Sequence, residues 1–354
     1  MAELEGAGEV REEDAFDVDA VAAWLRERGT DLGGPVEVRQ FAGGASNLTY
    51  SLRTPTQDLI LRRPPTGRKA KGAHDMGREY RIQAALKEPF GLVAEMVGLC
   101  DDETVIGSEF YVMQRVDGII PRRDFPPEVT LTEDDVRRLC GNALDVLTRL
   151  HRIDPASSAD LAALGKGTGY VRRQVEGWST RFRAARTEDV GDYEVVMAWL
   201  AEHQPDDVAN CVIHNDFRFD NLVLDRDDPT RVVGVLDWEM ATLGDPLMDL
   251  GGTLAYWVQD DDDEWFRQFR RQPTHLPGML TRAQVVERYC QTMGYSLTPE
   301  QWRFYEVFGL FRLGVIAQQI YYRYFHGQTH NEAYARFGPA AQYLELRCRQ
   351  IIGG

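Results

Sequence analysis

Residues 211–239, CVIHNDFRFDNLVLDRDDPTRVVGVLDWE, are the part of the chain that decides the fold. Cys211–Ile213 is an apolar triplet that predicts a short buried strand, and a loop with two Asp and two Asn follows it. Two further apolar runs, 222–224 and 232–236, flank the turn-rich sequence DRDDPT. Apolar runs joined by turn residues predict an antiparallel hairpin. The stretch therefore predicts a strand, a polar loop and a hairpin in succession.

The hairpin has a chemical consequence. It brings the residue before its first strand, Asn221, beside the residue after its second strand, Asp237. An amide oxygen and a carboxylate are hard oxygen ligands that suit Mg²⁺. Asp216 lies on the same loop as Asn221, and a carboxylate beside a metal can accept the proton of an incoming hydroxyl. The stretch thus predicts one general base and two metal ligands.

Length and charge exclude several classes of function. The chain has 354 residues, enough for two domains at about 150 residues each. Asp and Glu number 56 against 40 Lys and Arg, so the formal net charge is −16. Proteins that bind nucleic acid carry a basic face for the phosphates, so we expect no nucleic-acid partner. No uncharged apolar run of about 18 residues occurs, so we expect no membrane-spanning helix and no membrane partner.

The N-terminal residues and the cysteines bear on the compartment. Residues 1–16 are acidic and lack the apolar core of a secretory signal. The five cysteines are scattered and never spaced as CxxC, which fits reduced thiols rather than a disulfide or zinc framework. Both observations predict a cytoplasmic protein.

The pattern of residues divides the chain into three parts. Residues 1–34 predict a polar tail and one helix, which begins near Asp17. Residues 35–116 alternate apolar and polar side chains between Gly and Pro breaks, and one helical segment, 76–88, lies among them. Residues 117–354 are mostly helical in pattern. The prediction is an α+β protein with a small N-terminal antiparallel sheet, one helix packed on it, and a larger helical C-terminal part.

Two helices in the C-terminal part have distinct sequence signals. Thr132 and Asp135 have the spacing of a capping box, so a helix is expected to begin there. Residues 299–325 are apolar on most sides, which predicts a helix in the centre of the core. Glu306 and Arg312 interrupt that segment and favour a buried helix over a membrane span.

Between residues 211 and 250 the polar residues follow a fixed order: His214, Asp216 and Asn221, then Asp237-Trp238-Glu239, then Gly244-Asp245-Pro246 and Asp249-Leu250. This spacing resembles that of the aminoglycoside phosphotransferase (APH) family of kinase-like enzymes. It implies a two-lobed, protein-kinase-like fold. It also implies an ATP- and Mg²⁺-dependent transfer of a phosphoryl group to the hydroxyl of a small molecule. Asp216 would then be the base, and Asn221 and Asp237 would be the metal ligands.

By the same resemblance, the N-terminal sheet supplies the nucleotide site. The loop that covers the phosphates is expected at residues 41–47, between two strands. Glycines in such a loop allow backbone N–H groups to approach an anion closely. The residues that we expect to line the nucleotide there are Gly43, Gly44, Ser46 and Asn47.

Arg62 takes the place of a lysine in this comparison. Kinases carry a lysine on the following strand that holds the phosphates and pairs with a helix glutamate, and here that glutamate is Glu79. An arginine can bind carboxylate or phosphate through two parallel hydrogen bonds, so we expect Arg62 to act as the phosphate clamp; the alternative is a surface charge. Backbone groups near Gln114 and Val116, where the last strand leaves the sheet, are expected to bind adenine.

Two residues of the polar loop remain open to more than one interpretation. Arg218 stands where kinases carry a cation that faces the transferred phosphoryl group, and it is equally placed to pair with Asp220 or Asp245. We therefore keep Arg218 as a catalytic candidate. His214 is expected to be a packed structural residue rather than a proton shuttle.

The acceptor is the least determined part of the prediction. Segment 62–81 holds seven basic and two acidic residues, a charge of +5 that suits phosphates of ATP or of an acyl-CoA. Its LRRPP and REYR sequences resemble the APH-like branch related to kinase domains fused to acyl-CoA dehydrogenases, which implies a hydroxyacyl-CoA or other hydroxylated metabolite as acceptor. The acidic run Asp260–Glu264 could instead attract a cationic amino sugar, or it is a solvated loop.

Three other functions are weighed against this one. The first is phosphotransfer to an aminoglycoside or another antibiotic. The second is a pseudokinase-like module that binds nucleotide without transfer, against which the intact Asp216, Asn221 and Asp237 argue. The third is a structural protein that binds no nucleotide.

Overall fold

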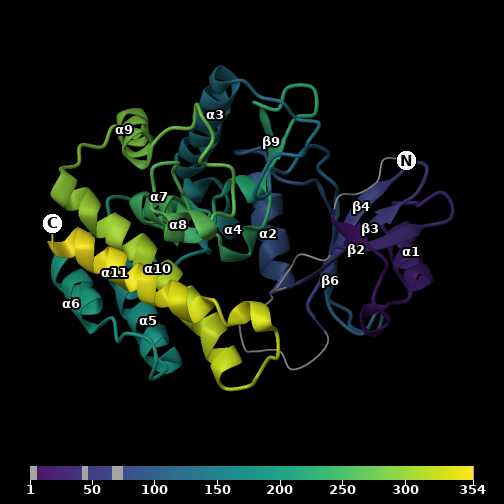
Figure 1. Ribbon diagram of the computed structural model, residues 1–354. Coiled ribbons are helices and arrows are strands. Elements are labelled where there is room, and N and C mark those ends of the chain that lie inside the picture. The colour runs from purple at the N-terminus through teal and green to yellow at the C-terminus, as the bar shows by residue number, and fades with distance from the viewer. Residues whose placement is uncertain (1–5, 42–46, 66–74, 354) are drawn as a thin grey trace. The chain divides into compact units, whose positions relative to one another are not determined.

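The computed structural model describes residues 6–41, 47–65 and 75–353 (Figure 1). The chain divides into two compact units. The first unit contains Met1–Gly118 and Val233–Glu239, and the second contains Ile119–Val232 and Met240–Gly354. The first unit is therefore discontinuous in sequence, and its second segment, Val233–Glu239, contains the Asp-Trp-Glu motif.

The first unit is built on a six-stranded sheet in the order β1-β2-β3-β4-β6-β5, with every neighbouring pair antiparallel. The strands are β1 (Ala7–Gly8), β2 (Glu37–Phe41), β3 (Leu48–Arg53), β4 (Asp58–Arg63), β5 (Met96–Cys100) and β6 (Phe110–Gln114). The register between β5 and β6 shifts at Met96–Gly98, where the pairing is irregular. The predicted N-terminal antiparallel sheet is confirmed.

Two helices cover the sheet, rather than the single one that the sequence predicted. Side chains alternate between the faces of a strand, and in β4 Leu59 and Leu61 pack with α1 (Val18–Glu27), whereas Ile60 packs with Met76 of α2 (Met76–Leu86). Both faces are apolar, so both must be covered. This is why α1, which the sequence analysis grouped with a tail, contributes Trp24 and its neighbours to the core of the sheet.

The second unit is mainly helical. Its helices are α3 (Glu133–His151), α4 (Ala159–Ala162), α5 (Tyr170–Ala185), α6 (Glu194–His203), α7 (Pro246–Ala255), α8 (Glu264–Gln268), α9 (Arg282–Met293), α10 (Pro299–Phe325) and α11 (Phe337–Gly353). The predicted capping box at the start of α3 is confirmed, with both reciprocal hydrogen bonds between Thr132 and Asp135 present. None of the described helices is long and apolar enough to cross a membrane.

Helix α10 is the centre of this unit, as its sequence predicted. It spans 27 residues and contacts α5, α6, α7 and α11. Figure 1 shows α10 and α11 running beside each other along one side of the unit. Two short strand pairs complete the fold: β7 (Cys211–Ile213) with β10 (Thr242–Gly244), and β8 (Leu222–Leu224) with β9 (Val232–Val235). The core helix thus lies directly behind the polar loop that follows β7, because Arg312 of α10 donates to that loop.

A glycine pair allows α7 and α10 to approach closely. A Cβ atom on Gly309 of α10 would lie 2.2 Å from the carbonyl oxygen of Gly251 in α7. Real Cβ atoms are not found at such a distance, and backbone cannot move aside cheaply. The crossing of the two helices therefore depends on glycine at this position.

We expect Gly309→Ala to lower the free energy of unfolding by about 2 kcal/mol or more, because the methyl group forces the helices apart. Gly177→Ala is the matched control, since a Cβ at this glycine in α5 meets no atom closer than 4.0 Å. The control should raise stability by about 0.5–1 kcal/mol through helix propensity. Urea unfolding of both variants measures this difference, and equal stabilities would contradict the close crossing.

Candidate functional site

The polar loop after β7 is held by a buried carboxylate, Asp249 of α7. Its two oxygens accept the backbone N–H groups of His214 and Asn215, each at 2.8 Å. The ring of His151 bonds to the same carboxylate through Nε2 at 3.1 Å, and its Nδ1 lies 2.5 Å from the Tyr289 hydroxyl. The carboxylate is 1% exposed. A helix, a histidine and a tyrosine thus fix the backbone on which the predicted base is carried.

Burial by itself would raise the pKa of the Asp249 carboxyl. The hydrogen bond and positive potential from His151, and the backbone N–H of His214, outweigh burial, and the pKa lies below its usual value. The carboxylate is therefore charged wherever the protein is folded at neutral pH. His214 is fully buried, and its Nδ1 accepts the N–H of Asp216 at 3.2 Å. Both histidines have the contacts of packed structural residues.

Asn215 has a left-handed backbone, with φ of 65°. A non-glycine residue adopts this conformation at a cost, and the surroundings must hold it there. Its side-chain oxygen accepts from Tyr170 at 3.1 Å, its amide donates to the Met240 carbonyl at 3.0 Å, and its own carbonyl accepts from Arg312 at 2.7 Å. The turn that aims the next residue, Asp216, is thus restrained from three sides.

The structure brings together the three predicted residues of the loop. The Asn221 amide donates to the Asp216 carboxylate at 3.0 Å and to the Asp216 carbonyl at 2.9 Å. Arg218 contacts the same carboxylate at 3.1 Å, and it also pairs with Asp220 at 3.4 Å. The Arg218 guanidinium stacks over the Tyr256 ring, 4.7 Å from its centre. The predicted base therefore has a fixed orientation and a cation beside it.

Asp245, the other partner considered for Arg218, has a different role. It caps α7 by accepting the N–H groups of Leu247 and Met248, and it also accepts from Val208 at 2.7 Å. Burial raises its pKa to about 6, against the lowering effect of these backbone donors. Arg218 is thus paired with Asp216 and Asp220, and Asp245 serves the helix start.

In the first unit, Arg62 lies at the centre of a buried network. Its guanidinium pairs with Glu79 of α2, lies 3.5 Å from the Tyr111 hydroxyl, and lies 3.6 Å from Asp237. Burial by itself would lower the pKa of Arg62, but Tyr111, Glu79 and Asp237 raise it well above its usual value. The Arg62 side chain is only 12% exposed, so the surface-charge alternative does not hold. The expected pairing of strand cation and helix glutamate is present.

The Asp-Trp-Glu motif is anchored by its middle residue. Trp238 is fully buried, donates from Nε1 to the Val235 carbonyl at 2.9 Å, and packs edge-on against Phe90. Asp237, directly before it, has a left-handed φ of 65°. Glu239, directly after it, accepts from the Asn47 amide at 3.4 Å. Strain at Asp237 is maintained by the packing of its neighbour, which is a frequent property of functional residues.

The other residues predicted to bind the nucleotide differ in what the structure says of them. Gly43, Gly44 and Ser46 lie outside the described residues. The backbone N–H of Gln114 already donates to the Glu95 carbonyl at 2.8 Å, whereas the Val116 backbone has no hydrogen-bond partner within the described ranges. Of the two predicted adenine contacts, Val116 therefore has the available donor.

The donor set for magnesium can be judged residue by residue. One carboxylate oxygen of Asp237 is buried and accepts no hydrogen bond from the described residues. Asn221 uses its amide nitrogen on Asp216, which leaves its oxygen for another partner. Residues 6–41, 47–65 and 75–353 contain no group of three or more His, Cys, Asp or Glu side chains that could hold a metal ion. A carboxylate oxygen and an amide oxygen are each of the ligand type that Mg²⁺ takes, together with phosphate oxygens and water. Asn221 belongs to the second unit and Asp237 to the first, and their joint role remains a prediction.

Two acids of the acidic run Asp260–Glu264 have structural contacts. Asp262 is buried and receives two hydrogen bonds from Arg282, at 2.6 and 2.8 Å, and a further contact from Arg347 at 3.5 Å. Asp263 caps α8 and accepts from the Tyr343 hydroxyl. Neither sequence interpretation of this run anticipated that two of its acids bind neighbouring helices. Asp262 is consequently not available to attract a cationic substrate, whereas the Asp263 side chain is 52% exposed.

The basic segment 62–81 is also partly internal. Arg63 is buried and bonds to the Tyr50 hydroxyl and to the Asp14 carbonyl, and Arg78 donates to the Glu239 carbonyl at 3.0 Å. With Arg62 buried as well, three of its seven basic residues serve the first unit itself. Three others, Arg68, Lys69 and Lys71, lie outside the described residues.

Comparison with known proteins identifies the family of the chain. A model of the phosphotransferase enzyme family, APH, matches residues 37–284, well over half of the chain. The chain belongs to this family. The kinase-like fold predicted from the polar loop is thereby confirmed.

Curated relatives are longer than the chain. Acyl-CoA dehydrogenase family member 10 of Mus musculus is 35% identical over 323 residues, which cover 90% of this chain and 30% of the relative. Acyl-CoA dehydrogenase family member 11 of Gallus gallus is 33% identical over 354 residues, which cover 97% of this chain and 44% of the relative. The chain thus spans less than half the length of these relatives.

Solved structures share the fold. A Ralstonia eutropha protein, provisionally assigned as an aminoglycoside phosphotransferase, is 31% identical with a TM-score of 0.80, covering 95% of this chain and 98% of that one. Macrolide 2'-phosphotransferase type I is 19% identical with a TM-score of 0.60, covering 95% and 97%. The second similarity shows the fold alone.

Asp249, Arg312 and Tyr170 are site residues whose roles the sequence analysis missed. Asp249 was noted within a motif without a role, and Arg312 was noted only as an interruption of an apolar helix. A buried cation in a core helix needs a polar partner, and this was the signal available for Arg312. Tyr170 had no comparable signal.

We expect Asp249→Asn to lower the free energy of unfolding at pH 7 by about 3 kcal/mol, because one of the two backbone N–H groups loses its acceptor inside the protein. The pKa of Asp249 is lowered by folding, so its stabilising effect is complete above its ordinary pKa of 3.8 and is lost as the pH falls further. The difference between the wild type and the variant should therefore narrow below pH 3.8.

Asp245→Asn is a control for which the expected pH dependence of the stability difference has the opposite sign. The pKa of Asp245 is raised by folding to about 6, so the charged form is disfavoured, and the wild type should lose stability relative to this variant as the pH rises from 3.8 to 6. Urea unfolding of both variants across pH 3–7 measures the two trends. Parallel trends for the two variants would contradict the assigned environments.

Proposed function

We propose that this phosphotransferase moves the γ-phosphoryl group of ATP to a hydroxyl of a small-molecule acceptor, with Asp216 as the general base. The observation that carries the proposal is the fixed carboxylate of Asp216, held by Asn221 and Arg218 on a loop that Asp249 anchors. Aspartate is a base for a hydroxyl proton, and positioning supplies most of the catalysis in phosphoryl transfer.

In this reaction the acceptor oxygen forms a bond to the γ-phosphorus while the bond from that phosphorus to the bridging oxygen of ADP breaks. The hydroxyl proton passes to the Asp216 carboxylate, and the electron pair leaves with ADP. Arg218, 3.1 Å from Asp216, places a positive charge where charge develops on the transferred group. Magnesium held by Asn221 and Asp237, together with phosphate oxygens, would neutralise phosphate charge.

The nucleotide contacts belong to the first unit. Arg62, oriented by Glu79, is assigned to the phosphates, and Asn47 follows the loop that contains Gly43, Gly44 and Ser46. The Val116 backbone is assigned to adenine, since its hydrogen-bonding groups are not used by described residues. These assignments rest on the family resemblance together with the contacts of each residue.

For the acceptor we favour a hydroxyacyl-CoA or another hydroxylated metabolite. Two curated relatives that cover 90% and 97% of this chain are named as acyl-CoA dehydrogenase family members, and they are more than twice its length. An acceptor related to acyl-CoA agrees with those names. The alternative, an aminoglycoside, has support from the provisional assignment of the Ralstonia eutropha protein. The burial of Asp262 in ion pairs with Arg282 and Arg347 weakens that alternative. A nucleotide-binding module without transfer is disfavoured by the assembled Asp216, Asn221 and Arg218.

We expect Asp216→Asn to lower kcat for phosphate transfer by at least about 100-fold, because the base is lost while its shape is kept. Mg-ATP should still raise the melting temperature of the variant, which separates lost chemistry from lost binding. Asp145→Asn, an exposed aspartate on α3, is the matched control and should keep wild-type turnover. A radiolabelled γ-phosphate screen over hydroxylated metabolites, acyl-CoAs and antibiotics provides the measurement. Wild-type turnover by Asp216→Asn would exclude Asp216 as the base.

Arg62→Lys should raise the KM for ATP about tenfold, because an ammonium group cannot form two parallel bonds with a phosphate while paired to Glu79. Arg63→Lys is the matched control. Arg63 is the next residue on β4, is more deeply buried than Arg62, and bonds to Tyr50 on the opposite face of the sheet. It should lower thermal stability and leave the KM for ATP unchanged. Equal effects of both variants on that KM would count against the clamp.

A further inference from the structure

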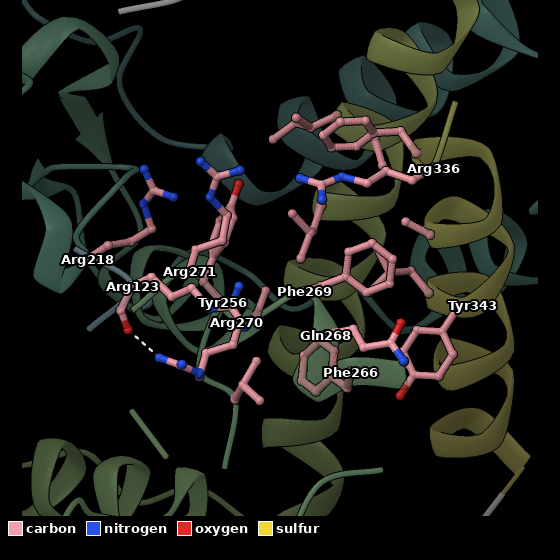
Figure 2. Close-up of a pocket in the computed structure, with 18 of the residues that line it drawn as sticks. Arg123, Arg218, Tyr256, Phe266, Gln268, Phe269, Arg270, Arg271, Arg336 and Tyr343 are labelled. Carbon is pink, nitrogen blue, oxygen red and sulfur yellow. Dashed lines mark hydrogen bonds between the residues drawn. The ribbon is translucent and has the colours of Figure 1, made fainter. Parts of the chain in front are cut away.

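The second unit contains a cavity of about 530 Å³ beside the predicted catalytic loop (Figure 2). A cavity of this size can hold a small molecule. Arg218 and Asp220 of the loop line one part of it, and residues of α7, α8, α10 and α11 line most of the rest, together with the connecting segments 122–123 and 269–271. The cavity is therefore the feature of the second unit that could hold a phosphate acceptor within reach of Asp216.

The charged lining of this cavity is almost entirely basic. Among the lining residues, Asp220 is the single acid, and six are arginines: Arg122, Arg123, Arg218, Arg270, Arg271 and Arg336. The formal charge of these seven side chains is 6 − 1 = +5, in a protein with a net charge of −16. Like charges gathered in one cavity repel one another unless an anion is bound between them.

Only two of the six arginines have acidic partners among the described residues. Arg218 pairs with Asp216 and Asp220, and Arg270 pairs with Asp124 at 2.8 Å. The side chains of Arg122, Arg123, Arg271 and Arg336 form no ion pair within the described ranges. Figure 2 shows the guanidinium groups of Arg218 and Arg271 on the same side of the cavity. That side is positively charged and lies next to the predicted base.

The other side of the cavity is mainly apolar, with Gln268 and Arg336 as its polar residues (Figure 2). Figure 2 shows Phe266, Phe269 and Tyr343 away from Arg218, between α8 and α11. Ile316 and Ile320 of α10 extend this surface, and Phe266 is buried. An apolar wall of this kind removes a hydrocarbon chain from water, with a gain of about fourfold in affinity for each methylene group. The two sides together require a ligand with an anionic end and a hydrocarbon part.

We propose that this cavity binds the acceptor, and that the acceptor is a hydroxylated amphiphile whose anionic group contacts Arg271 and whose hydrocarbon chain lies along Phe269 and Ile316. The proposal rests on the proposed function, since it names the substrate class of the same site. A cationic amino sugar would add positive charge to this lining and find no acidic side chain except Asp220. The carboxylate of a free hydroxy acid and the phosphates of its CoA thioester share the required chemistry.

Binding can be tested without turnover. Titration calorimetry of the full chain should show that decanoate binds, that octanoate and hexanoate bind progressively more weakly, and that decanol, which lacks the charge, binds at least tenfold more weakly than decanoate. Arg271→Gln should weaken decanoate binding about tenfold. Arg323→Gln is the matched control, because Arg323 is an exposed arginine of α10 that does not line the cavity, and it should bind decanoate as the wild type does. Equal binding of decanoate by Arg271→Gln and wild type, or no preference for decanoate over decanol, would overturn the proposal.

A transfer assay then identifies the source of the anion. 3-Hydroxydecanoate, its CoA thioester, decane-1,3-diol and kanamycin are each supplied with Mg-ATP. Transfer to the acid or to the thioester, reduced by Arg271→Gln, supports the proposal and shows which anion is used. Transfer to the diol or to kanamycin that Arg271→Gln leaves intact overturns the cavity assignment while phosphotransfer stands. Binding of decanoate that depends on Arg271, with no transfer to any hydroxyl, retains the cavity assignment and rejects the proposed function.

Discussion

The carboxylate of Asp249 is the interaction on which the rest of the second unit's site depends. It accepts two consecutive backbone N–H groups, those of His214 and Asn215, and it is itself held by His151. Buried N–H groups need a partner, and a charged acceptor binds them more strongly than a neutral one. Because the carboxylate is on the rigid helix α7, the backbone of the loop is held at a fixed position relative to that helix. Asp216 is then aimed by backbone geometry before any ligand is present.

The first unit also holds a carboxylate, that of Asp237, in a fixed place, but by aromatic packing and an ion pair rather than by backbone hydrogen bonds. Asp237 lies in a left-handed conformation, and the indole of Trp238 is the bulky anchor that keeps it there. Arg62 joins Asp237, whose side chain is 37% exposed, to the buried carboxylate of Glu79. In such surroundings each charge depends on the others, because a single unpaired ion would be costly to bury. The two units therefore each present a fixed carboxylate, one on a loop tied to a helix and one beside a buried aromatic ring.

The sequence predicted the parts of the fold whose signals are local. The capping box at Thr132, the central helix 299–325 and the strand-and-loop stretch 211–239 all depend on neighbours in the chain, and all were found as expected. The packing of α1 on the sheet was missed, because it depends on an apolar face formed by residues far away in sequence. The clustering of Asp216, Arg218 and Asn221 was predicted, since these residues lie within six consecutive positions of one loop. Arg312, about a hundred positions later, could be assigned to that loop only with coordinates.

Asp262 has a consequence for how the cavity would work. It fastens the start of α8 to Arg282 in α9 and to Arg347 in α11, so the helix that carries Phe266 is held in place by ion pairs out of water. The conformational entropy of the apolar wall that contains Phe266 is therefore lost when the chain folds, and little more is lost when a ligand binds. A ligand would therefore meet a preorganised surface. Association would be rapid, and affinity would depend sharply on the shape of the hydrocarbon chain, because the wall does not adapt to it.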